Sequence, residues 1–259
     1  MEQRKKNIKK SYSIAELVRV WVNDGNEVYL IFGTKRYIPA DIIIVHVDLS
    51  VVPDEYLEFA RRYPISINSS VKDIRKTLIS KNLLTREDSY AGKVIVKTNH
   101  NYAGRPELWI GKRKLLFNSP RDYPVFDTLA DVPDHFFESP DYVVEKFLPE
   151  IRDGLYYVRL FYFLGDRENC IWLAAKNPVV NGSTYLMTAN TEPHPEIRQL
   201  RKTLNFDYGK FDYVVNDGRI ILLDANKTTG KWNIDDRNRH LNLADIYRER
   251  AKGIYSYFR

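Results

Sequence analysis

The sequence predicts a protein of mixed α+β structure that begins with a small α/β lobe. Two observations support this prediction. The first 70 residues alternate strand and helix patterns, as α/β units do. The rest of the chain contains apolar segments separated by turn residues, typical of β-hairpins, with amphipathic helical patterns between them. At 259 residues the chain is long enough for one large domain or for two to three smaller lobes.

The N-terminal region contains a β-branched run, IIIVHV, that is typical of a parallel strand buried on both faces. This strand ends in His46, Asp48 and Ser50, at the carboxyl end, where open α/β sheets bind ligands. A core histidine is the alternative for His46. The expected elements are helices at 13–23, with Ser13 and Glu16 as a capping box, and at 53–63, and strands at 28–33, 41–53 and 64–68.

The middle and C-terminal regions contain the remaining elements. A short polar linker, TREDSYAG, marks a candidate lobe boundary at 85–92. The loop NHNYAG at 99–104 is small and polar and is able to expose backbone N–H groups. The expected helices are 71–84, 194–207 and 242–258, and the expected strands and hairpins are 93–98, 141–150, 156–180 and 210–226.

One predicted hairpin carries polar residues in an apolar setting. Asp212 lies inside its first strand, and Asp224 and Asn226 end its second strand. Asp224 and Asn226 are two residues apart, so both side chains leave the same face of the strand. Asp212 joins that face only if the loop holds an odd number of residues, as a three-residue loop with Gly218 in a bulge would. Three oxygen ligands on one face suit Mg²⁺; the alternative is two solvent-facing strand residues and a turn asparagine.

Composition restricts the class of protein. A net charge of +6 and a pI of about 9.1 suit an anionic ligand such as a nucleotide or a phosphorylated sugar, and we expect neither nucleic acid nor a membrane as partner. No apolar run approaches the ~20 residues that span a bilayer. The basic N-terminus lacks the apolar stretch of a secretory signal, so the expected location is the cytoplasm. The single cysteine, Cys170, lies in an apolar strand and is expected to be buried and inert.

Three segments together indicate a nucleotide site. Lys97 lies on a strand directly before the loop NHNYAG, and a lysine with free N–H groups can bind phosphates. The segment Glu145 to Leu148 ends a strand as a lobe-joining hinge does, and its backbone can read adenine. The hairpin can hold Mg²⁺ against the phosphates. Neither the P-loop motif GxxxxGK[ST] nor the dinucleotide motif GxGxxG is present, so these folds do not compete.

The order of these segments resembles the ATP-grasp superfamily. The resemblance is carried by KVIVKTN (93–99), VVEKFL (143–148), RLFYF (159–163) and FDYVVNDGRIILLDANKTTG (211–230), and it covers about residues 70 to 255. It implies an ATP-grasp fold, with two α+β nucleotide-binding lobes after the small α/β lobe. The implied division is 1–70 for the N-terminal lobe, 71–148 for the lobe with the phosphate lysine and flexible loop, and 149–259 for the lobe with the metal-binding hairpin.

The resemblance also implies individual roles. Lys97 corresponds to the lysine over the α-phosphate, and Lys76 is a second phosphate lysine or a surface residue. Arg159 stabilises phosphate or acyl-phosphate oxygens or pairs with Glu145, and Lys176 is a further catalytic candidate. Tyr157 stands where relatives place the acid that binds ribose, so Glu150 or Asp153 would substitute. The implied ATP-binding residues are Lys76, Lys97, Asn101, Gly104, Glu145, Lys146, Phe147, Leu148 and Asp153, and the implied metal ligands are Asp212, Asp224 and Asn226.

The chemistry implied by the resemblance is ATP-dependent ligation with ATP and Mg²⁺ or Mn²⁺. A carboxylate is activated as an acyl phosphate, and an amine or similar nucleophile then displaces phosphate. Two alternatives stay open: a kinase of the same fold that phosphorylates a small-molecule or sugar hydroxyl, and a basic protein that binds ATP or nucleic acid without turnover. The substrates are not named by the sequence, although its basic and aromatic composition suits anionic or sugar-linked molecules. A homodimer also stays open.

Overall fold

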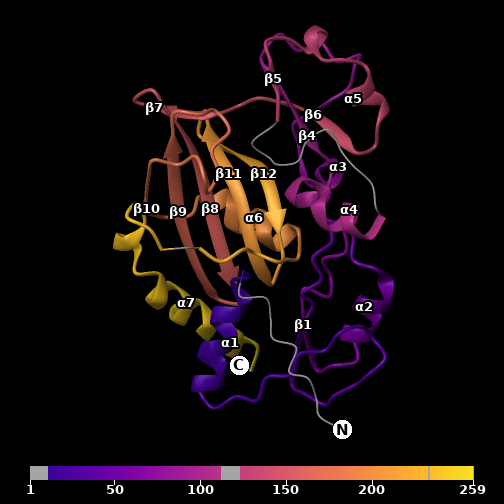
Figure 1. Cartoon of the computed structure of the whole chain (residues 1–259), viewed down its shortest axis with the longest axis vertical. Helices are drawn as coiled ribbons and strands as arrows, with labels where there is room; N and C mark the ends of the chain where they lie inside the picture. The colour runs from indigo at the N-terminus through magenta and orange to yellow at the C-terminus, as the bar shows by residue number, and fades with distance from the viewer. Residues whose placement is uncertain (1–10, 112–122, 233, 259) are drawn as a thin grey trace.

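The computed structural model describes residues 11–111, 123–232 and 234–258, and within them the chain forms three β-sheets (Figure 1). The largest sheet has the strand order β10-β9-β8-β11-β12, with β7 paired to β8. A four-stranded sheet has the order β3-β6-β4-β5, and a third sheet consists of β1 and β2. The two larger sheets are antiparallel and only the β1–β2 pair is parallel, which confirms the predicted α+β class with an α/β start.

The elements have the following bounds. The helices are α1 (Ile14–Asn23), α2 (Asp54–Ala60), α3 (Lys76–Ile79), α4 (Arg105–Gly111), α5 (His135–Glu138), α6 (Pro195–Thr203) and α7 (Leu243–Ala251), with 3₁₀ segments that include η1 (Asn101–Gly104) and η5 (Lys252–Phe258). The strands are β1 (Ile42–Ile44), β2 (Ile65–Ile67), β3 (Leu83–Leu84), β4 (Val94–Thr98), β5 (Val125–Phe126), β6 (Tyr142–Lys146), β7 (Glu150–Arg152), β8 (Leu155–Leu164), β9 (Arg167–Ala175), β10 (Met187–Thr191), β11 (Tyr208–Asn216) and β12 (Arg219–Asn226). No described helix has the length and apolarity needed to cross a bilayer.

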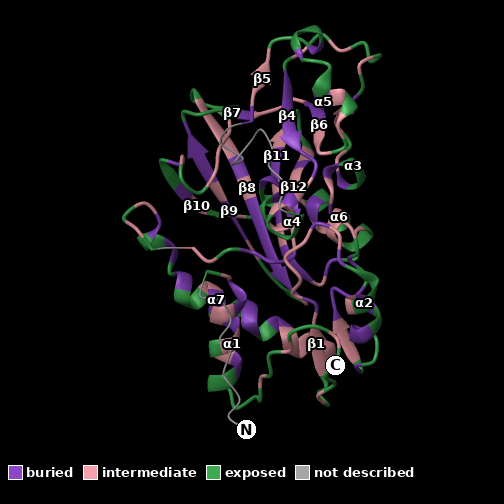
Figure 2. Cartoon of the chain, turned by 45° about the vertical axis from the view of Figure 1, so that its right-hand side comes forward, coloured by how far each residue is buried: buried purple, intermediate pink, exposed green. Residues whose placement is uncertain are grey.

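The large sheet separates two apolar clusters, because successive strand residues point to opposite faces. Phe161 and Phe211 belong to the cluster beneath α6, whereas Leu160 and Tyr162 belong to the cluster that also contains residues of α1 and α7. The long strands β8, β9 and β11 are accordingly buried over much of their length (Figure 2). Cys170 is buried on the α6 side, and burial raises the pKa of its thiol to about 12, so the prediction of an inert thiol is supported.

The predicted helix at 13–23 is confirmed as α1, but its predicted capping box is wrong. The Ser13 hydroxyl donates to the carbonyl of Gly230 at 2.7 Å instead of capping the helix. Trp21 on the same helix donates from its indole nitrogen to the carbonyl of Ala251 at 2.9 Å. Helix α1 therefore packs on the C-terminal part of the chain, beside α7, although it lies in the first 70 residues. The predicted three-part division at 70 and 148 stays a proposal.

Two other predicted elements are wrong. Residues 28–33 form no strand, and of the helix expected at 71–84 only α3 forms. The residues before α3 bond to another segment: Val52 donates its N–H to Lys72, and Ile74 donates its N–H to Ser50. A backbone group used in this way is not available for a helical hydrogen bond, so this tertiary pairing outweighs the amphipathic pattern. The strand expected at 41–53 is parallel, as predicted, but it is limited to β1.

The C-terminal segment docks through a close backbone approach. A Cβ atom added to Gly253 would lie 1.9 Å from the carbonyl oxygen of Leu164 at the end of β8. We therefore expect Gly253→Ala to lower the free energy of unfolding by about 1 to 3 kcal/mol, because backbone must move to relieve the overlap. Chemical denaturation measures the change. Gly182→Ala is the control, since nothing lies within 4 Å of its added Cβ. Equal stability of both variants would contradict the close approach.

Candidate active site

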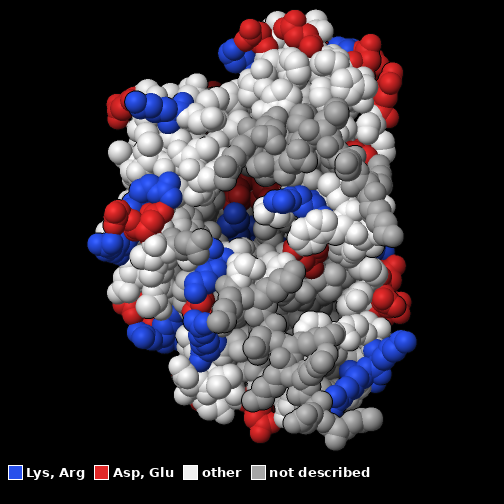
Figure 3. All heavy atoms as spheres, viewed as in Figure 1, with Lys and Arg blue, Asp and Glu red and all other residues white. Residues whose placement is uncertain are grey.

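A cavity of about 710 Å³ lies between the four-stranded sheet and the large sheet. Strand β4 contributes Ile95 and Lys97 from one side, and strands β8, β11 and β12 contribute the opposite wall. In Figure 3 a hollow opens near the centre of the molecule's face, and both basic and acidic atoms are visible inside it. Among the described residues, seven basic and three acidic side chains line the cavity, so this part of its lining carries an excess of positive charge.

The hairpin of β11 and β12 brings Asp212 and Asp224 to this cavity through a β-bulge. Its turn has two residues, Asp217 and Gly218, both with positive φ (49° and 76°), and not the three-residue loop expected from the sequence. A two-residue turn alone would place Leu223 opposite Asp212. The register shifts by one residue at this point, so Asp212 lies opposite Asp224. The predicted pairing of the two carboxylates is therefore correct, but the extra residue lies within the strand.

Lys210 is a site residue that the sequence prediction missed. It pairs with Asn226 in the same ladder, lines the cavity, and has its ammonium 2.8 Å from Asp212 Oδ1. The missed signal was the period of two along β11, which places residue 210 on the same face as residue 212. Burial lowers the pKa of Lys210, but Asp212 outweighs burial and raises it overall, so the side chain is cationic at neutral pH.

Two buried lysines face the hairpin from the other side. Lys76 Nζ lies 3.2 Å from Asp224 Oδ1 and 3.4 Å from the carbonyl oxygen of His100. Only 4% of Lys76 is exposed, which rules out the surface alternative considered from the sequence. Burial lowers the pKa of Lys76, but Asp224 and other nearby acidic groups raise it overall. Lys97 is also buried and pairs with Glu145 Oε2 at 2.6 Å.

The oxygen atoms of the hairpin fit a divalent cation. Asp212 Oδ1 is buried and accepts no hydrogen bond from a described residue, although Lys210 is close to it. Burial raises the pKa of Asp212, and Asp224 adds to this rise, so a cation would stabilise the ionised form. Asn226 Oδ1 accepts from the N–H of Thr228 at 2.7 Å and lies 3.3 Å from the Thr228 hydroxyl, whose single proton has a shorter bond, of 2.6 Å, to Asp48 Oδ1. In the described ranges no three His, Cys, Asp or Glu residues cluster, so the donor set is two carboxylates and one amide, which suits Mg²⁺ or Mn²⁺.

The predicted hinge lines the cavity in part. Lys146, Phe147 and Leu148 are lining residues, as expected. The N–H groups of Lys146 and Phe147 already donate to other backbone carbonyls, whereas the N–H of Leu148 donates to no described residue. Glu145 departs from its predicted place, because its side chain is 3% exposed and is directed to Lys97 instead of the cavity. A contact of Glu145 with an adenine amine is therefore not supported.

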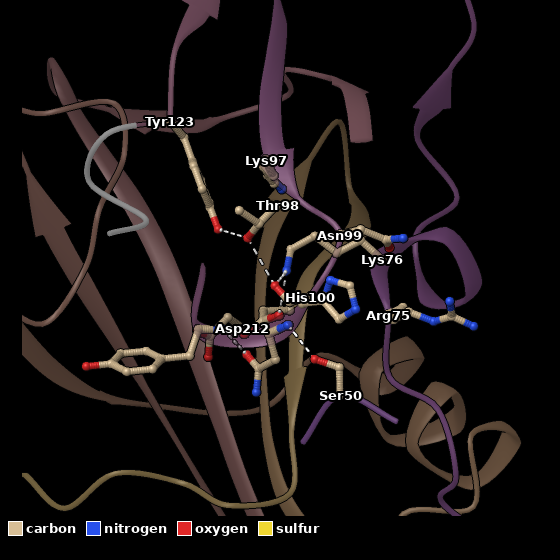
Figure 4. Close-up of polar contacts among 12 residues, drawn as sticks. Ser50, Arg75, Lys76, Lys97, Thr98, Asn99, His100, Tyr123 and Asp212 are labelled. Carbon is tan, nitrogen blue, oxygen red and sulfur yellow. Dashed lines mark hydrogen bonds and ion pairs between the residues drawn. The ribbon is translucent and has the colours of Figure 1, made fainter. Parts of the chain in front are cut away.

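The loop after β4 contributes Asn101, Tyr102 and Arg105 to the cavity, but not Gly104. Tyr102 and Ala103 adopt left-handed backbone conformations with φ of 49° and 54°, which is costly for residues other than glycine. The loop is held by its neighbours: the N–H of Asn101 donates to the Ser50 hydroxyl at 2.8 Å (Figure 4). The predicted loop of free N–H groups is thus partly wrong, because Ser50 already occupies one of them.

A second set of bonds ties the same loop to β4. The Thr98 hydroxyl donates to the carbonyl of His100 at 3.0 Å and lies 2.6 Å from the Tyr123 hydroxyl (Figure 4). These bonds orient Thr98 at the end of β4, directly after Lys97, and Tyr123 itself lines the cavity. The loop and the phosphate lysine therefore belong to one hydrogen-bonded unit.

Besides Gly104 and Glu145, three further predicted site residues are not among the described lining residues of the cavity. Arg159 alternates with Val158 and Leu160 along β8, so it points to the α6 side of the sheet, where it forms a double hydrogen bond with Glu150 at 2.8 and 3.0 Å. This placement does not support its assignment as a catalytic residue, and its ion-pair partner is Glu150 instead of Glu145. Lys176 and Asp153 are exposed and are not among the lining residues, so neither assignment is supported. Glu150 is committed to Arg159, whereas Tyr157 does line the cavity.

The end of the cavity opposite the hinge is formed by loops that the sequence did not mark. Arg237 stacks on the Tyr185 ring, 4.0 Å from its centroid, and pairs with Asp235 at 2.5 Å. Lys231 and Trp232 follow the hairpin and complete this wall. No local motif distinguishes these residues in the sequence, because their loops come together only through the tertiary fold.

Comparison of the sequence with protein-family models and with curated proteins gives no match. Among solved structures, the chain is similar to a RimK-domain ATP-grasp protein from Sphaerobacter thermophilus, at 11% identity over 93% of this chain and 95% of that chain, with a TM-score of 0.48. It is similar to macrocyclase MdnB from Microcystis aeruginosa, at 10% identity over 96% of each chain and a TM-score of 0.47. It is also similar to the ATP complex of D-alanine–D-alanine ligase from Bacillus anthracis, at 13% identity over 85% and 81% of the chains and a TM-score of 0.43. The first of these structures is an ATP-grasp protein, the superfamily that the sequence motifs resemble.

Proposed function

We propose that this protein is an ATP-dependent ligase that activates a carboxylate as an acyl phosphate for attack by an amine or a similar nucleophile. The observation that carries the proposal is the arrangement around the β11–β12 bulge. There, Asp212 and Asp224 lie opposite each other on the cavity wall, and Lys76 reaches across the cavity to Asp224 at 3.2 Å. Carboxylates that can hold a divalent cation and lysines that can bind phosphate oxygens are the groups that phosphoryl transfer requires.

The cavity has separate regions for the two halves of a nucleotide. Ile95, Leu148 and Leu223 form apolar surface at the hinge, where the N–H of Leu148, which donates to no described residue, can donate to a purine ring. The phosphates would then extend toward Lys76 and Lys97. Both lysines are buried, so they act in a region of low dielectric where their attraction for phosphate is stronger than in water.

In this proposal the residues of this chain position the substrates and neutralise the negative charge of the phosphates, and they do not form covalent bonds with the substrate. Mg²⁺ held by Asp212, Asp224 and Asn226 would neutralise charge on the transferred phosphoryl group. Lys210 lies beside these ligands and replaces Arg159 as the candidate for binding acyl-phosphate oxygens. Approach of the two sheets would exclude water, which otherwise hydrolyses an acyl phosphate.

Thermal unfolding with and without MgATP tests the nucleotide site. At about 100 times its Kd, MgATP should stabilise the protein by about 2.7 kcal/mol and raise Tm by about 5 to 10 °C. We expect Asp224→Asn to lose most of this increase relative to its own ligand-free Tm. Asp217→Asn is the matched control, because it makes the same chemical change in the turn of the same hairpin and outside the cavity. Failure of the wild type to respond to millimolar MgATP would refute the proposed function.

Release of inorganic phosphate distinguishes ligation from the kinase alternative. Carboxylates and amines would be supplied in pairs with MgATP, and phosphate would be followed together with the masses of the products. A ligase releases phosphate only when both partners are present and forms a product joined by loss of water. A phosphorylated acceptor without free phosphate would instead identify a kinase.

A further inference from the structure

Arg250 on α7 is a buried cation without an ionic partner. Only 5% of Arg250 is exposed to solvent. Its Nε and Nη1 atoms are buried without a hydrogen-bond partner in the described part of the chain. No described carboxylate forms an ion pair with it either. A buried charge without a partner costs several kcal/mol, so its presence requires a reason other than the stability of the helix.

Tyrosine rings surround this guanidinium. Its central carbon lies 4.7 Å from the centroid of the Tyr162 ring and 5.1 Å from that of Tyr247. Tyr208 is a third buried tyrosine close enough to interact electrostatically with it. We call these three residues the tyrosine cage. Cation–π attraction offsets part of the cost of burial but supplies no negative charge.

The hydroxyl groups of the tyrosine cage bind the segment that follows the metal-binding hairpin. Trp232 donates from its indole nitrogen to the Tyr162 hydroxyl at 2.5 Å and from its backbone N–H to the Tyr247 hydroxyl at 3.2 Å. The Tyr208 hydroxyl lies 3.4 Å from that of Thr229. Arg250 therefore contacts the rings whose hydroxyls fix Trp232, and Trp232 forms a wall of the cavity.

One cation near this end of the cavity has no carboxylate partner among the described residues. Its ion pairs are Lys210 with Asp212, Lys231 with Glu16 and Arg237 with Asp235. Each of these cations is paired with a carboxylate. Among the described residues near this end of the cavity, Arg250, which lies behind the tyrosine cage, is the cation without a carboxylate partner. An anionic group bound against Trp232 would supply the missing negative charge.

We propose that Arg250 is a positioning residue that fixes the Trp232 wall through the tyrosine cage and makes this wall the place where the carboxylate of the substrate binds. This inference rests on the proposed ligase function for the identity of the substrate, but the anion site can exist without nucleotide. The inference gives Arg250 two separable roles. Its planar guanidinium orients the tyrosine rings, and its positive charge attracts the anion.

Nuclear magnetic resonance of the tryptophan indole groups tests both parts. Sodium acetate, the probe, would be titrated against sodium chloride at equal ionic strength, and Trp232→Phe would identify the Trp232 resonance. In the wild type, acetate should move this resonance and chloride should not. In Arg250→Met the resonance should start at a different position, and the apparent affinity for acetate should fall by about threefold to tenfold. Arg250→Lys keeps the charge and should recover most of the acetate response.

The controls separate this role from general stability. Arg248→Met changes an exposed arginine of the same helix that pairs with Asp245, and it should leave the Trp232 resonance and the acetate response unchanged. If Arg250→Met does not fold, Tyr247→Phe removes one hydroxyl bond to Trp232, keeps the ring, and should still shift the resonance. An unchanged acetate response in folded Arg250→Met, or none in the wild type, would overturn the inference. MgATP binding is measured separately, so failure of the ligase proposal would be seen independently.

Discussion

Lys97→Met is expected to lower the free energy of unfolding by about 3 to 5 kcal/mol, because it leaves Glu145 as an unpaired buried charge. The two side chains form an ion pair of 2.6 Å between N and O, and they are 8% and 3% exposed. Glu145 Oε1 already lacks a hydrogen-bond partner, so nothing else in the described structure compensates for the loss. Urea denaturation measures the change, and the same variant should bind MgATP about tenfold to a hundredfold more weakly.

A double variant separates the two roles of Lys97. Lys97→Met combined with Glu145→Gln removes both charges and keeps similar side-chain volumes, so most of the lost stability should return. MgATP binding should stay weak, because the phosphate contact is still missing. If the double variant recovered both properties, Lys97 would be a structural residue. A loss of less than about 1 kcal/mol in the single variant would mean that Glu145 is not confined to the interior.

Acidification is expected to destabilise the protein through His46, by about 2 to 3 kcal/mol between pH 6.5 and pH 4. Burial lowers the pKa of His46 to about 4, although Asp48 opposes the shift, and its Nε2 is buried with no hydrogen-bond partner among the described residues. The unfolded chain therefore binds a proton near pH 6.5 that the folded chain accepts only near pH 4. The contribution of His46 to the free energy of unfolding is constant above about pH 6.5. It falls as the pH is lowered from 6.5 to 4, and it is constant again below about pH 4.

The comparison with His46→Phe isolates this contribution from other groups that titrate in the same range. Phenylalanine keeps a ring against Tyr12, whose ring centroid lies 5.1 Å from that of His46, and it has no titratable nitrogen. Free energies of unfolding would be measured at intervals from pH 7.5 to pH 4 for both proteins. The difference between them should change in favour of the variant as the pH falls. Parallel curves would show that His46 is protonated equally in the folded and unfolded states.

Local patterns in the sequence predicted the hairpins of the large sheet and the polar face of β11 and β12. They succeeded because Asp212, Asp224 and Asn226 interrupt apolar segments, and such interruptions are visible without knowledge of the fold. Lys97 was found in the same way, at the end of an apolar strand before a polar loop. Asp212 and Asp224 do lie opposite each other, but the cause is a bulge at Leu223 and not a three-residue turn. No turn residue in the sequence marks this bulge.

The errors arose where tertiary contacts decide the outcome. Arg159 was assigned to the site from its place in the chain order, but the alternation of side chains along β8 turns it to the opposite face. Lys76 was predicted on a long helix, whereas tertiary hydrogen bonds at Lys72 and Ile74 shorten that helix and bury Lys76 at the cavity. The loops that carry Trp232 and Arg237 lack any periodic signal. Their contribution to the site depends on contacts between segments distant in sequence.

The burial of Cys170 makes this protein suitable for measurements with a single attached label. Its thiol is the only one in the sequence, and burial keeps it protonated and out of contact with reagents in solution. A cysteine introduced at Glu138, exposed on α5 beside the four-stranded sheet, would therefore react alone with a maleimide dye. Fluorescence from that dye would follow the movement of one sheet toward the other during turnover, without removal of the native cysteine.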